Sequence, residues 1–328
     1  MFKTKKLALA GITLSAMLGA PSVMAAPIFM QGDFLYTQVS DDGTLGDENA
    51  IPGLIHDATG TGTFDTARGD YLRPGSPFEG FGISSDQFST VGNRNSSSDQ
   101  VSQVSLTDLG GGAFDNHVRW EGTADNGFFD IVHDFFFDDD DENLNITTTI
   151  TAASDLTNLA FSRAIDPDPD NYSGGSASTN NERGLDLNND GDYDDAGELA
   201  QTDFISASGV LSGLTIGMFT ESDYEHNSGI VTFCCSVITP SSYVFGGSYA
   251  PVAGFDSVGD HGIGLGFMIG DLNAGESATL SYSYVFGDTV GTVDIPGDDD
   301  PTDVPAPATI LLFGIGLMGM SMRKRLAK

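Results

Sequence analysis

Oxygen-bearing side chains gather between positions 186 and 198 of this 328-residue sequence, which makes this the segment best suited to chemistry. Carboxylate and amide oxygens at alternating positions wrap around a hard cation such as calcium, and Gly191 permits the sharp turn that wrapping requires. Nothing nearby indicates a reaction, so we expect Ca²⁺ in a structural role, tying a long loop to the body. The expected ligands are Asp186, Asn188, Asp190, Asp192 through its backbone carbonyl, Asp194 and Glu198.

The segment resembles the first half of an EF-hand calcium loop, with oxygen side chains at positions 1, 3 and 5 and glycine at position 6. It departs from that pattern at position 12, where Gly197 stands and the carboxylate follows one residue later as Glu198. No flanking helices are expected. The resemblance therefore implies a free-standing loop, similar to dockerin or thrombospondin segments. An acidic turn that holds no metal is the alternative.

A second acidic segment carries Asp166, Asp168 and Asp170, separated by two prolines. Proline holds the chain extended and prevents it from continuing a ladder. Two interpretations stay open. The three carboxylates share a cation, which could also draw on the calcium loop that follows, or Arg163 pairs with one of them at the end of a strand.

No catalytic motif emerges from the histidines, since none lies in a nucleophile or zinc motif. His133 lies on the aromatic face of its predicted strand, where a core histidine is expected. Trp120 is likewise expected in the core, with stacking on a sugar ring as the alternative. Carboxylates are so numerous that a glycosidase-like pair stays open. The sequence favours a non-enzymatic role and leaves catalysis undecided. The histidines considered are His56, His117, His133, His226 and His261.

Hydrophobic residues recur with a period of two, rich in aromatic and β-branched types, which is typical of half-buried strands. We predict an all-β fold, an antiparallel β-sandwich with long acidic loops. Residues 41–116 are expected to be long loops around a few strands, and 138–142 a turn. The predicted strands are 129–137, 144–151, 263–269 and 278–286, with shorter candidates at 117–122, 156–163, 214–220 and 229–237.

The N-terminus has the layout of a secretory signal peptide. Three lysines within the first six residues precede an apolar run over 7–18, and Val23 and Ala25 occupy the positions that signal peptidase reads. Residues 1–25 are therefore expected to form a signal helix that signal peptidase removes. The adjacent Cys234 and Cys235 are unsuited to bridging each other, so no disulfide framework is expected.

Charge is concentrated in the body between the two ends. Seven of the thirteen basic residues lie in the tails, which leaves six arginines, no lysine and all 47 acidic residues in the body, a formal charge of −41. Such a surface repels nucleic acid and anionic lipid headgroups. It suits a salty medium, where screening shortens the repulsion.

The C-terminus has three parts: Val304, Pro305 and Pro307 in a proline-rich hinge, an apolar run, and the basic residues Arg323, Lys324 and Arg325. This layout resembles the PEP-CTERM sorting signal of Gram-negative bacteria that make exopolysaccharide, although Ala306 replaces the family's usual Glu. The resemblance implies a short C-terminal hydrophobic helix, transient anchoring in the inner membrane and processing by an exosortase. Fourteen residues from 309 to 322 fall short of the roughly 20 that span a bilayer, and basic residues stay cytoplasmic.

We divide the chain into a signal peptide (1–25), a β-sandwich body of one large or two-lobed domain (26–290), an acidic linker (291–303) and the sorting segment (304–328). The expected function is that of an exported, calcium-stabilised protein of the cell surface or matrix, structural or adhesive, with exopolysaccharide as candidate partner. The alternative is a secreted carbohydrate-active enzyme or sugar-binding module.

Overall fold

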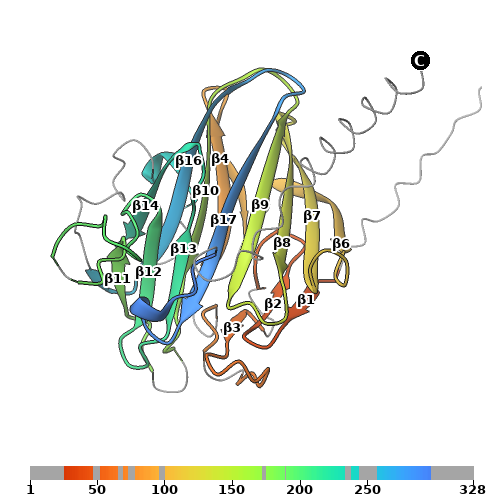
Figure 1. Ribbon diagram of the computed structural model, residues 1–328. Helices are drawn as coiled ribbons and strands as arrows, with labels where there is room; N and C mark the ends of the chain where they lie inside the picture. The colour runs from red at the N-terminus through yellow and green to blue at the C-terminus, as the bar shows by residue number, and fades with distance from the viewer. Residues whose placement is uncertain are drawn as a thin grey trace, which may run out of the picture.

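The computed structural model describes residues 26–46, 52–65, 69–72, 78–95, 100–171, 175–188, 190–232, 238–243 and 257–296. Within these ranges the protein is all-β, with antiparallel sheets and almost no helix (Figure 1). The predicted signal helix, the C-terminal hydrophobic segment with its sorting residues, and both cysteines lie outside the described residues.

The described residues form three sheets and two short 3₁₀ helices. The three-stranded sheet contains, in order, β1 (Ile28–Gln31), β2 (Leu35–Val39) and β3 (Leu54–His56). The five-stranded sheet has the order β14 (Glu225–Val231), β16 (Gly262–Leu272), β10 (Leu156–Asp166), β4 (Phe78–Ser85), β5 (Phe88–Arg94). The nine-stranded sheet has the order β15 (Ser257–Gly259), β11 (Thr179–Arg183), β12 (Phe204–Gly209), β13 (Thr215–Phe219), β17 (Ser277–Gly287), β9 (Asn143–Ala152), β8 (Phe129–Phe137), β7 (Asn116–Ala124), β6 (Val101–Asp108). The helices are η1 (Pro240–Ser242) and η2 (Val290–Thr292).

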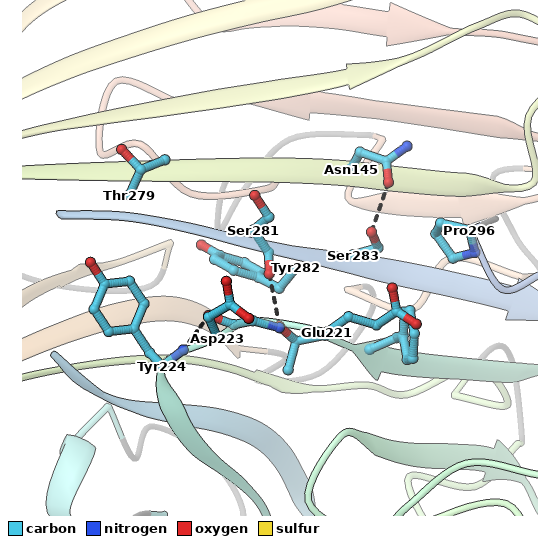
Figure 2. A pocket seen from close by; sticks show the side chains of 12 residues that line it. Asn145, Glu221, Asp223, Tyr224, Thr279, Ser281, Tyr282, Ser283 and Pro296 are labelled. Carbon is cyan, nitrogen blue, oxygen red and sulfur yellow. Dashed lines mark hydrogen bonds between the residues drawn. The ribbon is translucent and has the colours of Figure 1, made fainter. Parts of the chain in front are cut away.

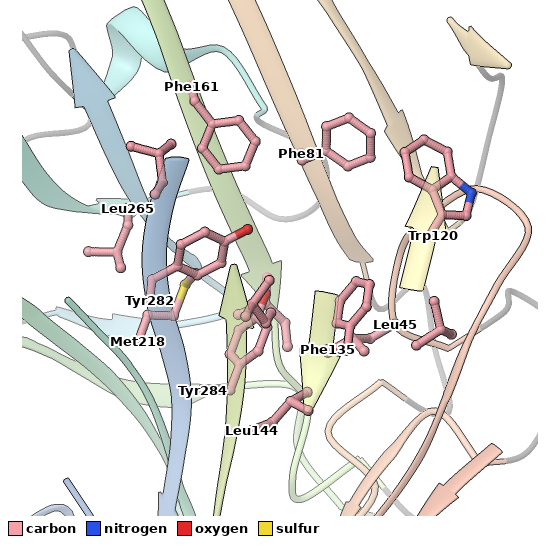
Figure 3. Packing of buried hydrophobic residues seen from close by; sticks show 14 of the residues in the cluster. Leu45, Phe81, Trp120, Phe135, Leu144, Phe161, Met218, Leu265, Tyr282 and Tyr284 are labelled. Carbon is pink, nitrogen blue, oxygen red and sulfur yellow. The ribbon is translucent and has the colours of Figure 1, made fainter. Parts of the chain in front are cut away.

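The five-stranded and nine-stranded sheets pack face to face around one aromatic core (Figure 3). Phe161 of β10 lies 5.9 Å, ring to ring, from Tyr282 of β17. Phe81 of β4 contacts both Trp120 of β7 and His133 of β8. Fully burying each such aromatic side chain contributes about 1.5–3 kcal/mol, so this interface holds the sandwich together.

Alternation of residue types explains the two-layer arrangement. In β8, buried residues alternate with more exposed ones along the whole strand, as the sequence predicts for 129–137. Successive side chains of a strand point to opposite faces, so Phe129, Phe135 and Phe137 face the partner sheet while Asp130 and Asp134 face outward. The strands predicted at 144–151, 263–269 and 278–286 are confirmed as β9, β16 and β17.

One sequence-based expectation about strand bounds needs correction. The strand predicted at 229–237 is β14, which begins at Glu225 and ends at Val231, and residues 233–237 lie outside the described part. Its first half is polar because β14 is an edge strand of its sheet, where solvent-facing positions tolerate polar residues. The 41–116 region supplies β3 to β6, in line with the few strands expected there.

Arg163 pairs with Glu79, so the alternative that pairs it with a carboxylate of the 166–170 segment is wrong. The side chains of Arg163 and Glu79 are both 0% exposed, and Arg163 Nε donates to Glu79 Oε1 over 2.5 Å. The physical reason is strand parity. Phe161, Arg163 and Ile165 point into the core between the sheets, whereas Asp166 lies on the opposite face of β10.

Trp120 is fully buried, which confirms the core interpretation over sugar stacking. Its indole N–H donates to the carbonyl of Asp41 over 2.7 Å. Gly43 has a φ of +72°, and a Cβ there would lie 2.5 Å from the indole ring. Only glycine therefore lets this loop close over the tryptophan.

Candidate functional site

The acidic loop connects β11 to β12, and backbone hydrogen bonds close it where it leaves the sheet. Leu185 and Leu199 exchange backbone hydrogen bonds of 2.9 and 3.1 Å, which closes the loop like the end of a ladder. Gly184, with a φ of +78°, leaves space for the ring of Tyr193, whose nearest atom lies 2.6 Å from where a Cβ would stand. The loop is therefore anchored to the sheet at both ends.

Local hydrogen bonds arrange the first carboxylates of this loop. The side-chain oxygen of Asp186 accepts from the backbone N–H of Gly191 over 2.9 Å, and that of Asn188 accepts from Asp190 N–H over 2.8 Å. Asp190 accepts in the same way from Asp192 N–H over 3.1 Å. Asp and Asn favour such turns because their short side chains mimic a backbone acceptor. Gly191 adopts a φ of +91° at the bend.

Three carboxylates converge in the loop. Asp190, Asp192 and Asp195 each offer an oxygen, and the three oxygens all lie within 4.8 Å of one another. All three residues are exposed, and no other such triple occurs among the residues that the structure describes. A side-chain hydrogen bond with Asp194 raises the pKa of the Asp192 carboxyl, and repulsion from Asp190 and Asp194 adds to the rise. A cation of the calcium type would relieve this repulsion.

The structure brings Asp190 and Asp192 of the predicted ligand set together, and it adds Asp195, which sequence spacing did not select. A turn over 195–198, in which Gly197 has a φ of +84°, breaks the strict alternation on which the prediction relied. Asn188 donates to the Asp195 carboxylate over 2.6 Å. Glu198 folds back and accepts from Leu187 N–H over 3.0 Å, so it braces the loop. Asp186 and Asp194 stay outside the converging triple.

The three carboxylates of the 166–170 segment lie in two different environments. Asp170 is 0% exposed, and its carboxylate accepts from the N–H groups of Leu211 and Ser212 over 2.6 and 3.1 Å. Asp166 and Asp168 are 2% and 4% exposed, and the Oδ1 atom of each is buried without a hydrogen-bond partner.

Burial dominates the titration of this second pair. Burial, and then repulsion from Asp168 and Asp260, raises the pKa of Asp166 to about 8. Burial likewise raises the pKa of Asp168 to about 7, although a hydrogen bond from Asn171 opposes it. These two carboxyls are therefore costly to ionise unless a positive charge lies beside them.

A pocket of about 370 Å³ lies on the outer face of the nine-stranded sheet (Figure 2). Thr279 and Ser281 of β17 form its floor, and the loop after β13 supplies Glu221, Asp223 and Tyr224. Thr220 fastens this loop by donating to the Ser281 carbonyl over 2.8 Å. Two carboxylates, several hydroxyls and an aromatic ring are the groups that bind sugars. The sequence did not reveal the pocket, because its residues are far apart along the chain.

The histidines lie in separate places. His133 is fully buried and accepts from or donates to Thr148 over 2.8 Å, as expected for a core residue, and burial lowers its pKa well below the usual value. His117 contacts Asp134 over 2.7 Å, and His226 contacts Asp203 over 3.0 Å. His56 is paired with Glu142, and His261 immediately precedes β16.

Residues 303–325 match the family model of the PEP-CTERM protein-sorting motif. The chain carries a PEP-CTERM sorting signal. A motif of this kind implies an exported protein that an exosortase processes at the membrane. In the part of the chain that the structure describes, no helix is long and apolar enough to cross a membrane. A comparison with curated proteins finds no match.

Solved structures resemble the PEP-CTERM protein's fold only distantly. A bacterial glucoamylase complexed with acarbose has a TM-score of 0.47 and 10% identity over 83% of this chain, which spans 34% of the glucoamylase. A TPR-domain containing protein from Parabacteroides distasonis has a TM-score of 0.45 and 12% identity, covering 86% of this chain and 50% of that one. An α-mannosidase from Enterococcus faecalis has a TM-score of 0.41 and 11% identity, covering 81% and 30%. Likenesses at this level assign no activity.

Proposed function

We propose that this PEP-CTERM protein is a calcium-stabilised component of the cell surface or extracellular matrix, with a structural or adhesive role. Export follows from the sorting motif. The single observation that carries the calcium proposal is the convergence of Asp190, Asp192 and Asp195 within 4.8 Å in an anchored loop. Hard oxygen ligands at this spacing suit Ca²⁺, which takes six to eight oxygens at roughly 2.3–2.6 Å.

The proposed role of the ion is to hold the loop compact. Without a cation, the three carboxylates repel one another and the loop depends on its hydrogen bonds alone. With the ion bound, Asn188 and Glu198 brace its ligands through the hydrogen bonds already described. Water and backbone carbonyls would complete the coordination. The ion would thus join β11 to β12 through a stable connection.

Thermal unfolding of the purified full chain tests this proposal. At a calcium concentration of about 100 times its dissociation constant, one bound ion adds about 2.7 kcal/mol of stability. For a domain of this size, that corresponds to a rise in melting temperature of roughly 5–10 °C. Asp190→Ala should abolish most of the rise. Asp140→Ala, which alters an exposed aspartate in the β8–β9 turn, should leave it intact. Equal melting curves in calcium and in EDTA would contradict the proposal.

The pocket supports a second candidate function, a sugar-binding module or a carbohydrate-active enzyme of the matrix. Glu221 and Asp223 would accept hydrogen bonds from sugar hydroxyls, and Tyr224 offers a ring face. A glycan array and a hydrolysis screen with the full chain test this idea. Asp223→Asn should weaken any binding, whereas Glu225→Gln, a nearby exposed control, should not. Binding that survives Glu221→Gln together with Asp223→Asn would place the sugar elsewhere.

A further inference from the structure

Asp166 and Asp168 are buried carboxylates whose Oδ1 atoms lack any donor. The two residues are only 2% and 4% exposed, and Asn171 donates to the other oxygen of Asp168 over 3.2 Å. By contrast, Asp170 accepts from the backbone N–H groups of Leu211 and Ser212. A buried carboxylate oxygen without a hydrogen bond carries a large desolvation cost. Proteins offset that cost with a proton, a basic side chain or a metal ion.

Among the described residues, no basic side chain offsets the cost of burying these two carboxylates. The ion pairs found there do not include Asp166, Asp168 or Asp260. The nearest arginine in the sequence, Arg163, is on the opposite face of β10, where its Nε and Nη2 donate to Glu79. Among the described residues, a proton or a bound cation therefore remains to offset the burial of these two carboxylates.

A glycine lies beside Asp166 on the neighbouring strand. A Cβ at Gly262 of β16 would lie 3.9 Å from the Cβ of Asp166, so glycine adds no side chain on that side of the carboxylate. Asp260, two residues before Gly262, is exposed and interacts electrostatically with both buried carboxylates. Prolines 167 and 169 hold the segment extended and keep it out of the ladder.

We propose that Asp166 and Asp168, with Asp260 on the solvent side, bind a second calcium ion that is separate from the ion of the 186–198 loop. The ligands are hard oxygens, which Ca²⁺ prefers. Unlike the loop triple, these three carboxylates do not all lie within 4.8 Å of one another. In this proposal the two buried aspartates hold the ion and Asp260 acts at longer range. Water and carbonyl oxygens supply the remaining coordination.

The second site can be tested independently of the loop site, because the two ligand sets share no residue. The test measures calcium stoichiometry of the full chain by isothermal titration, in wild type and in a loop variant, Asp190→Asn with Asp192→Asn. The loop variant should still bind one ion. Adding Asp166→Asn and Asp168→Asn should remove that ion. A loop variant that binds no calcium, or one whose ion survives the added substitutions, overturns the second site. If Asp166→Asn with Asp168→Asn, made in the otherwise wild-type chain, removes all calcium binding, the loop site is overturned instead.

A neighbouring aspartate controls for misfolding. Asn has the shape of Asp, and the unpartnered Oδ1 atoms of Asp166 and Asp168 lose no hydrogen bond on substitution. In EDTA, Asp166→Asn with Asp168→Asn should therefore melt at or above the wild-type temperature. Asp170→Asn should melt lower with or without calcium, because it weakens the two bonds from Leu211 and Ser212. A lower melting temperature in EDTA for the 166 and 168 variant contradicts the proposal.

Discussion

Replacing Glu79 with Gln should destabilise the sandwich strongly, because Glu79 neutralises a fully buried arginine. Its carboxylate accepts two hydrogen bonds from Arg163, of 2.5 and 3.0 Å. It also accepts from Tyr284 OH over 2.9 Å and from Leu45 N–H over 2.8 Å. Burial alone would lower the pKa of Arg163, but attraction to Glu79 outweighs burial and raises it. Without Glu79 the arginine still keeps its proton, because the guanidinium is too strong a base to lose it inside a protein.

The expected magnitude follows from leaving one charge of a buried pair uncompensated, which costs about 3–5 kcal/mol. Against a typical total stability of about 5–15 kcal/mol, this loss is large. Urea unfolding followed by fluorescence measures it well, since Trp120 is the only tryptophan of the chain and lies in the same core. The midpoint should fall, with little change in slope, because the surface exposed on unfolding stays the same.

Two further variants decide whether charge is the cause. Glu79→Gln with Arg163→Met removes both partners and should recover much of the loss, since an apolar pair of similar volume often replaces a buried ion pair without cost. Glu225→Gln, at an exposed position of the same sheet, should change stability by about 0.5 kcal/mol or less. A loss below about 1 kcal/mol for Glu79→Gln, or a double variant as unstable as the single one, would refute the reasoning.

Three other predictions follow from single sites. His117 and Arg119 bind Asp134 and, against the opposing effect of burial, lower its pKa below 3.8. The stability from ionised Asp134 is thus present above pH 3.8 and lost as pH falls through the lowered value. Urea midpoints of wild type and Asp134→Asn should differ by about 0.2–1 kcal/mol near neutral pH and converge in acid, and a pH-independent gap would contradict this. Gly43→Ala should lower the melting temperature, since a Cβ would lie 2.5 Å from Trp120, and an unchanged melt would argue against the tight contact. Deleting residues 304–328 should release or mislocalise the protein in cell fractionation, whereas unchanged surface retention would oppose the sorting role.

Local pattern made the central strands predictable from the sequence. Alternating aromatic and β-branched residues identify β8, β9, β16 and β17, because each buries one face against the partner sheet. Polar edge strands such as β14 lack that signal. The pairing of Glu79 with Arg163 was not foreseen, because the two residues are 84 positions apart and lie on neighbouring strands, β4 and β10.

The candidate sites were predictable to the extent that they are local. The acidic loop follows from spacing within thirteen residues, yet the entry of Asp195 depends on a turn that spacing alone does not reveal. The pocket combines a loop after β13 with hydroxyls of β17, and only the folded sheet brings them together. Burial of Asp166 and Asp168 likewise depends on distant segments, since Asp166 pairs with Phe78 of β4 and Asp168 N–H donates to the Tyr71 carbonyl.

Hydrogen–deuterium exchange at the acidic loop tests the central claim most directly. With calcium, exchange at residues 186–199 should slow markedly relative to EDTA, because bound carboxylates hold the turns around Gly191 and Gly197 closed. Exchange in β8 and β9 should stay the same and serves as the internal reference. In Asp190→Asn with Asp192→Asn, calcium should no longer slow exchange in the loop. Equal exchange of the wild-type loop in calcium and in EDTA would contradict a calcium-stabilised surface protein.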